Sequence, residues 1–344
     1  MVSISCFKQK WRERVFKLAA MLKRRFSISL AVAALALVGC TATGPAPVPG
    51  TVGDATARRE LLQPWIELTG ANLGASLAPP GIAGGSGYVR LRQPTSISAR
   101  GNDIYLLDVG LQRIFRYDRA QQTLTPFTSV TPDAEMSVYA APDLSVYVTD
   151  PAHNQVLHFA WDGTPLPPLS SPGNLARPIA VTVDEGSGQV LVADGLYDRI
   201  ISFNNLGRPL SVIKPQGVQA IAAMAQGPDG LFVVDRIARQ VVVVGHDGIY
   251  RYAFGAGSLT GPNAIAVSRG NLVFVADNFD QHIKVYRGGK LVATVGGMGA
   301  APGRFNGIAG LAVDAGLLYV ADSLNARVQI MLITPQALGT GKGG

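Results

Sequence analysis

The sequence predicts an all-β fold, and within that class a six-bladed β-propeller. An apolar run that ends in aspartate recurs six times, at Asp108, Asp150, Asp194, Asp235, Asp277 and Asp322. Successive aspartates are 42, 44, 41, 42 and 45 residues apart. Each period has room for four short strands separated by turn residues such as Pro228-Asp229-Gly230. Four strands in about 42 residues are the dimensions of one propeller blade.

Each repeat contains the same elements in the same order. A first strand of small and β-branched residues precedes every apolar run, at residues 95–99, 137–141, 179–183, 220–224, 264–267 and 310–313. The apolar run itself is the second strand. A third strand follows each aspartate, at residues 114–117, 156–159, 200–203, 241–244, 283–286 and 328–331. A looser fourth strand comes next, such as residues 291–295, so that every full repeat supplies one blade.

The sixth repeat lacks a fourth strand, because it ends at residues 331–334. A blade short of one strand would expose unpaired backbone groups. Residues 65–69 are strand-like and precede the first repeat. We therefore expect residues 62–69 to close blade six as its outer strand.

The repeats resemble the NHL family. The resemblance is clearest in the fifth and sixth copies, GPNAIAVSRGNLVFVADNFDQHIKVY and IAGLAVDAGLLYVADSLNARVQIM. The second and fourth copies depart from the pattern, since Gln155 and Gln240 replace the arginine that follows the aspartate. The resemblance extends over about residues 93–333 and implies a propeller domain at 61–334. Residues 335–344 are expected to be a disordered tail.

The N-terminal segment has the features of an export signal. Lys23, Arg24 and Arg25 precede an apolar core at 27–38, which is too short for a comfortable membrane span. The core ends in Leu37-Val38-Gly39-Cys40, which resembles a bacterial lipobox. This resemblance implies cleavage before Cys40 and acylation of its thiol. An ordinary cleaved signal or a single-span anchor remains the alternative.

These features divide the N-terminal part of the chain. Residues 1–39 are expected to be a signal peptide whose true start is Met21, and residues 40–60 a lipidated N-terminus with a flexible linker. Thr41 stands where aspartate commonly signals retention in the inner membrane. The predicted location is therefore the bacterial cell envelope, at the outer membrane and facing the periplasm.

The charge of the chain argues against a nucleic-acid partner. Eight of the 30 basic residues and one of the 23 acidic residues precede Cys40. The remainder has 30 − 8 = 22 basic and 23 − 1 = 22 acidic residues, so its net charge is zero. The basic balance belongs to the signal segment, and a neutral domain lacks the excess of positive charge that nucleic acids attract.

The six repeated aspartates are interpreted as structural anchors. A carboxylate at the end of a strand can accept backbone N–H groups in the turn that follows. A residue present in every blade serves the blade, whereas a catalytic or binding site usually breaks the symmetry. A functional site is therefore expected where the repeats differ.

The expected channel offers little for catalysis. The first strands line the channel of a propeller, and none of the six ranges contains Asp, Glu, His, Cys or Lys. The four histidines (His153, His158, His246 and His282) show no zinc-ligand spacing. Asp184 and Asp314, just past strand ends, are loose candidates for a metal site. No metal and no cofactor are predicted.

The segments after the repeated aspartates vary most and are expected to cluster on one face. Their candidate binding residues are Tyr197, Arg236, Arg239, Phe279 and His282. The sequence thus favours a lipid-anchored envelope protein that binds or scaffolds a partner protein and is otherwise monomeric. The alternative is a metal-dependent hydrolase or lyase with a site at the channel mouth.

Overall fold

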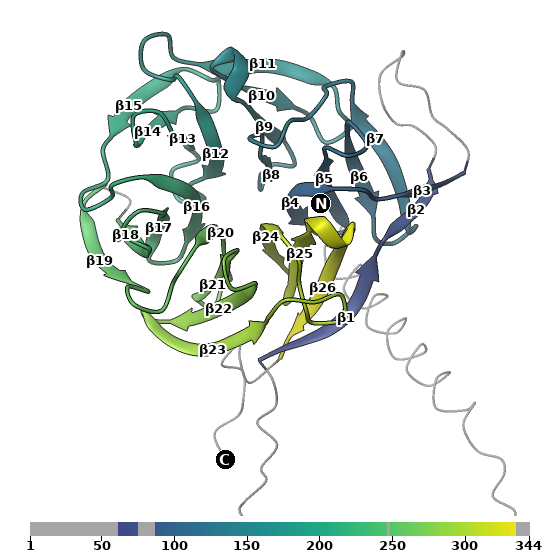
Figure 1. The fold of residues 1–344 in the computed structure, drawn as a ribbon. Helices are drawn as coiled ribbons and strands as arrows, with labels where there is room; N and C mark the ends of the chain where they lie inside the picture. Colours follow the sequence, from purple (N-terminus) through teal and green to yellow (C-terminus); the bar gives the residue numbers. More distant parts are fainter. Residues whose placement is uncertain (1–60, 75–86, 246–247, 335–344) are drawn as a thin grey trace, which may run out of the picture. The chain divides into compact units, whose positions relative to one another are not determined.

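A computed structural model describes residues 61–74, 87–245 and 248–334, all within one compact unit. They form six β-sheets arranged around a central channel (Figure 1). The prediction of an all-β, six-bladed propeller is confirmed. The predicted signal peptide, the lipidated linker and the tail after residue 334 lie outside the described residues.

The first three blades run outward from the channel in sequence order. Blade one contains β4 (Pro94–Arg100), β5 (Asp103–Asp108), β6 (Arg113–Asp118) and β7 (Thr123–Thr128). Blade two contains β8 (Val138–Ala140), β9 (Val146–Asp150), β10 (Gln155–Phe159) and β11 (Pro165–Ser170). Blade three contains β12 (Pro178–Val183), β13 (Val190–Asp194), β14 (Arg199–Phe203) and β15 (Pro209–Ile213).

The last three blades repeat this order, except for the outer strand of blade six. Blade four contains β16 (Ile221–Gly227), β17 (Gly230–Asp235), β18 (Gln240–Val244) and β19 (Tyr250–Phe254). Blade five contains β20 (Pro262–Val267), β21 (Leu272–Asp277), β22 (His282–Arg287) and β23 (Lys290–Gly296). Blade six contains β24 (Ile308–Asp314), β25 (Leu317–Asp322) and β26 (Arg327–Ile333).

The fourth strand of blade six comes from the start of the domain, as predicted. β1 (Leu62–Leu68) pairs antiparallel with β26, from Leu62 opposite Ile333 to Leu68 opposite Val328. Both end residues of β1 are buried, while the residues between them face outward. The first and last strands of the domain therefore lie side by side and close the ring (Figure 1).

The segment after β1 forms strands that the sequence did not predict. β2 (Gly70–Leu73) pairs in parallel with β7 and antiparallel with β3 (Tyr88–Arg90), so that blade one becomes a six-stranded sheet. Gly70 permits this crossing because a side chain there would overlap with the backbone of Val89. The N-terminal segment thus joins the outer edges of two neighbouring blades.

Apolar side chains fill the spaces between neighbouring blades. The second strand of every blade is buried along nearly its whole length. One cluster joins Tyr105 and Leu107 of blade one to Val146 and Val148 of blade two. Because each blade packs on two neighbours, the ring is a continuous core that holds its edge loops in fixed positions.

The antiparallel order gives the ring two distinct faces. The loop face carries the connections that follow the repeated aspartates and the beginnings of the inner strands. The hairpin face carries the turns between the first and second strands and between the third and fourth strands. The described helices are two short 3-10 turns on the loop face, η1 (Pro151–His153) and η2 (Ser323–Asn325), and no described helix is long and apolar enough to cross a membrane.

Candidate functional site

The repeated aspartates organise the loop face. Asp235 is fully buried and accepts backbone N–H groups from Gln219 and Ala220 at 2.7 and 3.3 Å, and from Ile237 and Ala238 at 3.0 and 3.1 Å. One carboxylate therefore ties the connection before the inner strand to the turn after the second strand. Asp108, Asp194 and Asp277 make the same kind of bridge in their own blades.

Blades two and six depart from this arrangement. Asp150 accepts the backbone N–H of His153 and the side-chain amide of Gln155, and its side-chain partners among the described residues follow it in the chain. Asp322 accepts one backbone N–H, from Asn306, and pairs with the buried guanidinium of Arg327 at 2.7 Å. Arg327 also reaches Glu67 of β1 at 2.8 Å, so the anchor of blade six is linked to the closing strand.

Blade five places a second charge beside its anchor. The ammonium of Lys284 lies 2.6 Å from Asp277 and 2.8 Å from Asp280. Burial opposes ionisation of Asp277. The hydrogen bonds from Lys284 and from Thr260 outweigh burial and lower the pKa of Asp277 from 3.8 to about 2. This carboxylate is therefore ionised and fully paired, and it is held within its blade.

The residue two positions after each repeated aspartate is small in the first two blades and large and apolar in the other four. Blades one and two have Gly110 and Ala152 at this position. Blades three to six have large apolar side chains that are between 55% and 80% exposed, namely Leu196, Ile237, Phe279 and Leu324. Tyr197 adds an exposed aromatic ring beside Leu196. These five residues lie in corresponding loops of four neighbouring blades and are called here the apolar arc.

The apolar arc is held by the anchors beneath it. The backbone N–H of Leu196, Ile237 and Phe279 donates to the repeated aspartate of its own blade, at 3.0, 3.0 and 3.3 Å. The residue four positions after each repeated aspartate has a left-handed backbone in every blade, as at Asp198 and Arg239. The ring of Tyr197 stacks on the guanidinium of Arg199, which itself pairs with Asp194. The exposed side chains are thus presented from rigid turns.

The structure places the five candidate binding residues from the sequence in different surroundings. Tyr197 and Phe279 belong to the apolar arc, and Arg236 and Arg239 are exposed in the loop of blade four, on either side of Ile237. His282 differs from these four residues in its exposure. It begins β22, is only partly exposed, and has its Nδ1 3.2 Å from Asp280.

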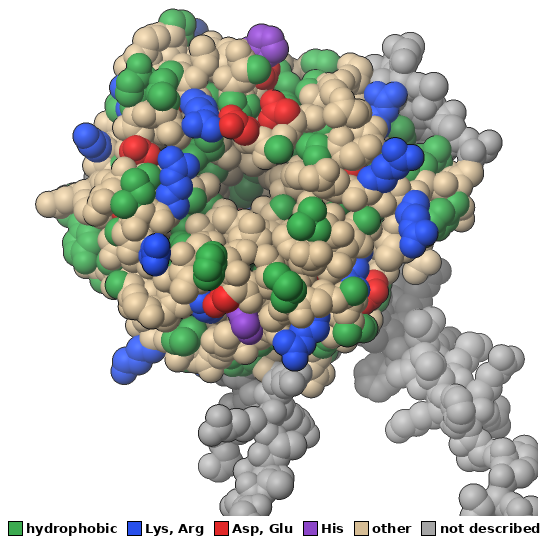
Figure 2. Space-filling model, viewed as in Figure 1, with side chains coloured by type: hydrophobic (Ala, Val, Ile, Leu, Met, Phe, Trp, Pro, Cys, Tyr) green, Lys and Arg blue, Asp and Glu red, His purple; other side chains and the backbone are tan. Residues whose placement is uncertain are grey.

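The central channel has a volume of about 1000 Å³ and is lined by all six inner strands. Small side chains such as Ser98, Ala180, Ala266 and Gly310 form its walls, as the sequence predicted. Figure 2 shows the hollow at the centre of the ring, with hydrophobic, basic and acidic side chains around it.

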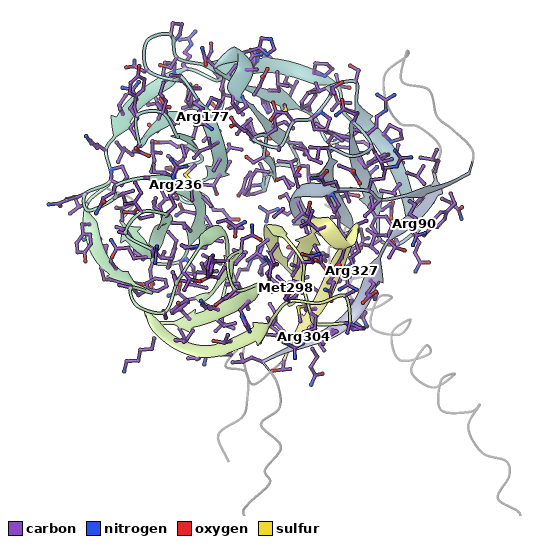
Figure 3. All side chains as sticks on the ribbon, viewed as in Figure 1. Arg90, Arg177, Arg236, Met298, Arg304 and Arg327 are labelled. Carbon is purple, nitrogen blue, oxygen red and sulfur yellow. The ribbon has the colours of Figure 1, made fainter. Side chains whose placement is uncertain are left out.

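The two mouths of the channel carry charges that lie beyond the predicted strand ranges. Glu135, Arg177 and Arg236 line the mouth on the loop face, and Figure 3 labels both arginines, which come from neighbouring blades. Arg177 binds Glu135 through two nitrogens, at 2.6 and 3.2 Å. On the hairpin face, Arg100 pairs with Glu185 at 3.5 Å, and Asp184 and Asp314 line the channel.

Among the residues that the structure describes, no three His, Cys, Asp or Glu side chains come together as a metal-binding group. His158 stacks face to face on Tyr147, and burial lowers its pKa. His153 pairs with Asp150 at 2.8 Å on the loop face. The described arrangement offers contact surfaces and charged mouths, and its best-formed exposed feature is the apolar arc.

Comparison with known proteins supports the fold. No family model and no curated protein matches the chain. Among solved structures, virginiamycin B lyase from Staphylococcus aureus is similar with a TM-score of 0.56 and 14% identity, over 79% of this chain and 99% of the lyase. A protein of unknown function from Bacteroides thetaiotaomicron has a TM-score of 0.60 and 15% identity, over 76% of this chain and 75% of its own. At such identities the likeness shows the propeller fold alone.

Proposed function

We propose that this chain is a lipid-anchored binding or scaffold protein of the bacterial cell envelope, with repeats of the NHL type. Acylated Cys40 anchors it to the outer membrane, and the domain faces the periplasm. The propeller holds a partner protein on its loop face. The lipobox-like sequence before Cys40 supports the anchor, and mass spectrometry of the mature N-terminus tests it by asking whether Cys40 is the lipidated first residue.

The apolar arc is the observation that carries the binding proposal. Four consecutive blades expose a large apolar side chain at one repeat position, and Phe279 is 80% exposed. Aromatic residues are enriched in binding hot spots, and Tyr197 and Phe279 supply two exposed aromatic rings on this face. The turns beneath them are fixed by buried hydrogen bonds, so little conformational entropy is lost when a partner binds.

Photocrosslinking in living cells tests the proposal. A benzophenone amino acid replaces Phe279 on the loop face, and in a matched variant it replaces Leu206, which is 71% exposed in a turn of the hairpin face. The proposal predicts a discrete protein adduct at position 279 and none at position 206. Equal adducts at both positions, or none at position 279, would contradict it.

Metal analysis separates this proposal from a metal-dependent hydrolase or lyase with a site at the channel mouth. Asp184 and Asp314 are the carboxylates that such a site would use first. Stoichiometric zinc or calcium in the purified chain, lost when Asp184 and Asp314 are replaced by Asn, would favour the enzyme over the scaffold.

A further inference from the structure

Some charged side chains around the apolar arc have an ion-pair partner, and others have none among the described residues. The loop of blade four carries Arg236 and Arg239, and its one carboxylate, Asp235, is buried under four backbone N–H groups. Within the described part of the chain, the structure shows no side-chain hydrogen bond or ion pair for either arginine. Two exposed guanidinium groups therefore flank Ile237, one of them at the channel mouth.

The other charged groups near the apolar arc are already paired. Arg199 and Arg327 bind the anchors of their own blades, at 3.4 and 2.7 Å. Asp280 pairs with Lys284, and Asp198 accepts the backbone N–H of Ile221 at 2.9 Å. In the loops that follow Asp194, Asp235 and Asp277, the exposed charged side chains without a hydrogen-bonding partner among the described residues are thus the guanidinium groups of Arg236 and Arg239.

We infer that the partner docks on the apolar arc through an acidic polypeptide segment that also carries apolar side chains, and that its carboxylates pair with Arg236 and Arg239. The inference rests on the proposed function and adds the chemistry of the partner. Guanidinium groups bind carboxylates through paired, charge-assisted hydrogen bonds. Tyr197 and Phe279 flank the blade-four loop from the neighbouring blades and would receive the apolar side chains of the segment.

Two other occupants fit the surface less well. A flat anionic membrane would touch all six blades. Blade two, however, presents the exposed carboxylate of Asp133 on the same face, and blades one and two have Gly110 and Ala152 in place of the large apolar residues. A second copy of this chain with the blade-four loop at the two-fold axis would bring Arg236 and Arg239 against identical positive groups. An extended acidic segment can follow blades three to six alone and avoid both conflicts.

The test keeps the benzophenone amino acid at position 279 of the full chain and changes the neighbouring charges. One variant carries Arg236→Glu and Arg239→Glu, and a conservative variant carries Arg236→Lys and Arg239→Lys. A third carries Arg208→Glu and Arg269→Glu on the hairpin face, which makes the same change in net charge. Thermal unfolding of each purified variant confirms that the propeller is intact.

Charge reversal at Arg236 and Arg239 is expected to lower the yield of the protein adduct about tenfold or more. The lysine variant and the hairpin-face variant should stay within about threefold of the parent. Mass spectrometry should place the crosslink in a segment with an excess of Asp and Glu. The inference would be overturned by an unchanged yield after charge reversal, by a crosslinked segment without an excess of Asp and Glu, or by an adduct to phospholipid. None of these results would overturn the proposal that the loop face binds a partner. Complete absence of an adduct in the parent would overturn the proposed function itself.

Discussion

The loop face and the hairpin face use the same residue type, aspartate, in different ways. On the loop face, Asp108 and Asp235 accept backbone groups 15 or 16 positions earlier in the chain. On the hairpin face, Asp118 and Asp162 accept N–H groups two or three residues later and close their own turns, while Asp314 accepts the backbone N–H of Gly101 at 2.9 Å. The loop face is therefore held by non-local bonds, which explains how it can present exposed apolar side chains in fixed positions.

Both faces expose apolar and basic side chains. Phe279, Arg236 and Arg239 are exposed on the loop face, and Leu206, Arg208 and Arg269 are exposed on the hairpin face. The loop face differs in what lies beneath its exposed apolar residues, because a buried carboxylate accepts the backbone N–H of Leu196, Ile237 and Phe279.

The largest expected effect compares two aspartates of blade four. Asp235→Ala removes the acceptor of four backbone N–H groups from a buried site and should lower the free energy of unfolding by about 3 kcal/mol or more. Asp229→Ala removes an exposed hairpin-face carboxylate that accepts from Tyr252 at 3.0 Å and should cost about 1 kcal/mol or less. Urea unfolding measures both. Equal losses of unfolding free energy in the two variants would contradict the different roles of aspartate on the two faces.

A smaller effect concerns the acid dependence of blade five. Because the pKa of Asp277 is about 2 in the folded state, below the unfolded value of 3.8, its pairing stabilises the fold above about pH 4 and is lost as the pH falls toward 2. Lys284→Met should therefore be less stable than the parent at pH 6, by a margin that shrinks as the pH falls to 2. Urea unfolding from pH 6 to pH 2 measures that margin, and a margin independent of pH would refute the coupling.

Much of the fold was predictable because the propeller is a repeat. The period gave the blade number, and the missing fourth strand of the sixth repeat required residues near Trp65 to close the ring. β2 and β3 were not predictable, since their pairing with blade one depends on where the chain lies after β1. The inner strand of blade two was expected at residues 137–141 and is shorter, at Val138–Ala140.

The candidate site was predictable only in part. Tyr197 and Phe279 were found because they lie in the variable segments, but the shared position of Leu196, Ile237 and Leu324 was overlooked. Aligning the six repeats on their aspartates would have revealed it, since Gly110 and Ala152 occupy that position in blades one and two. The placement of Arg236 at the channel mouth and the partial burial of His282 depend on contacts between blades, which spacing along the chain does not reveal.

Thiol accessibility tests the central claim, that the loop face is the surface covered by a partner. Cys6 and Cys40 are the only natural cysteines, so Phe279→Cys and Leu206→Cys each place a single thiol within residues 61–334. Both variants are labelled with a maleimide in intact cell envelopes and again after purification. The account predicts that position 279 is protected in envelopes and reactive once purified, while position 206 is reactive in both. Equal labelling of the two positions in envelopes would contradict it.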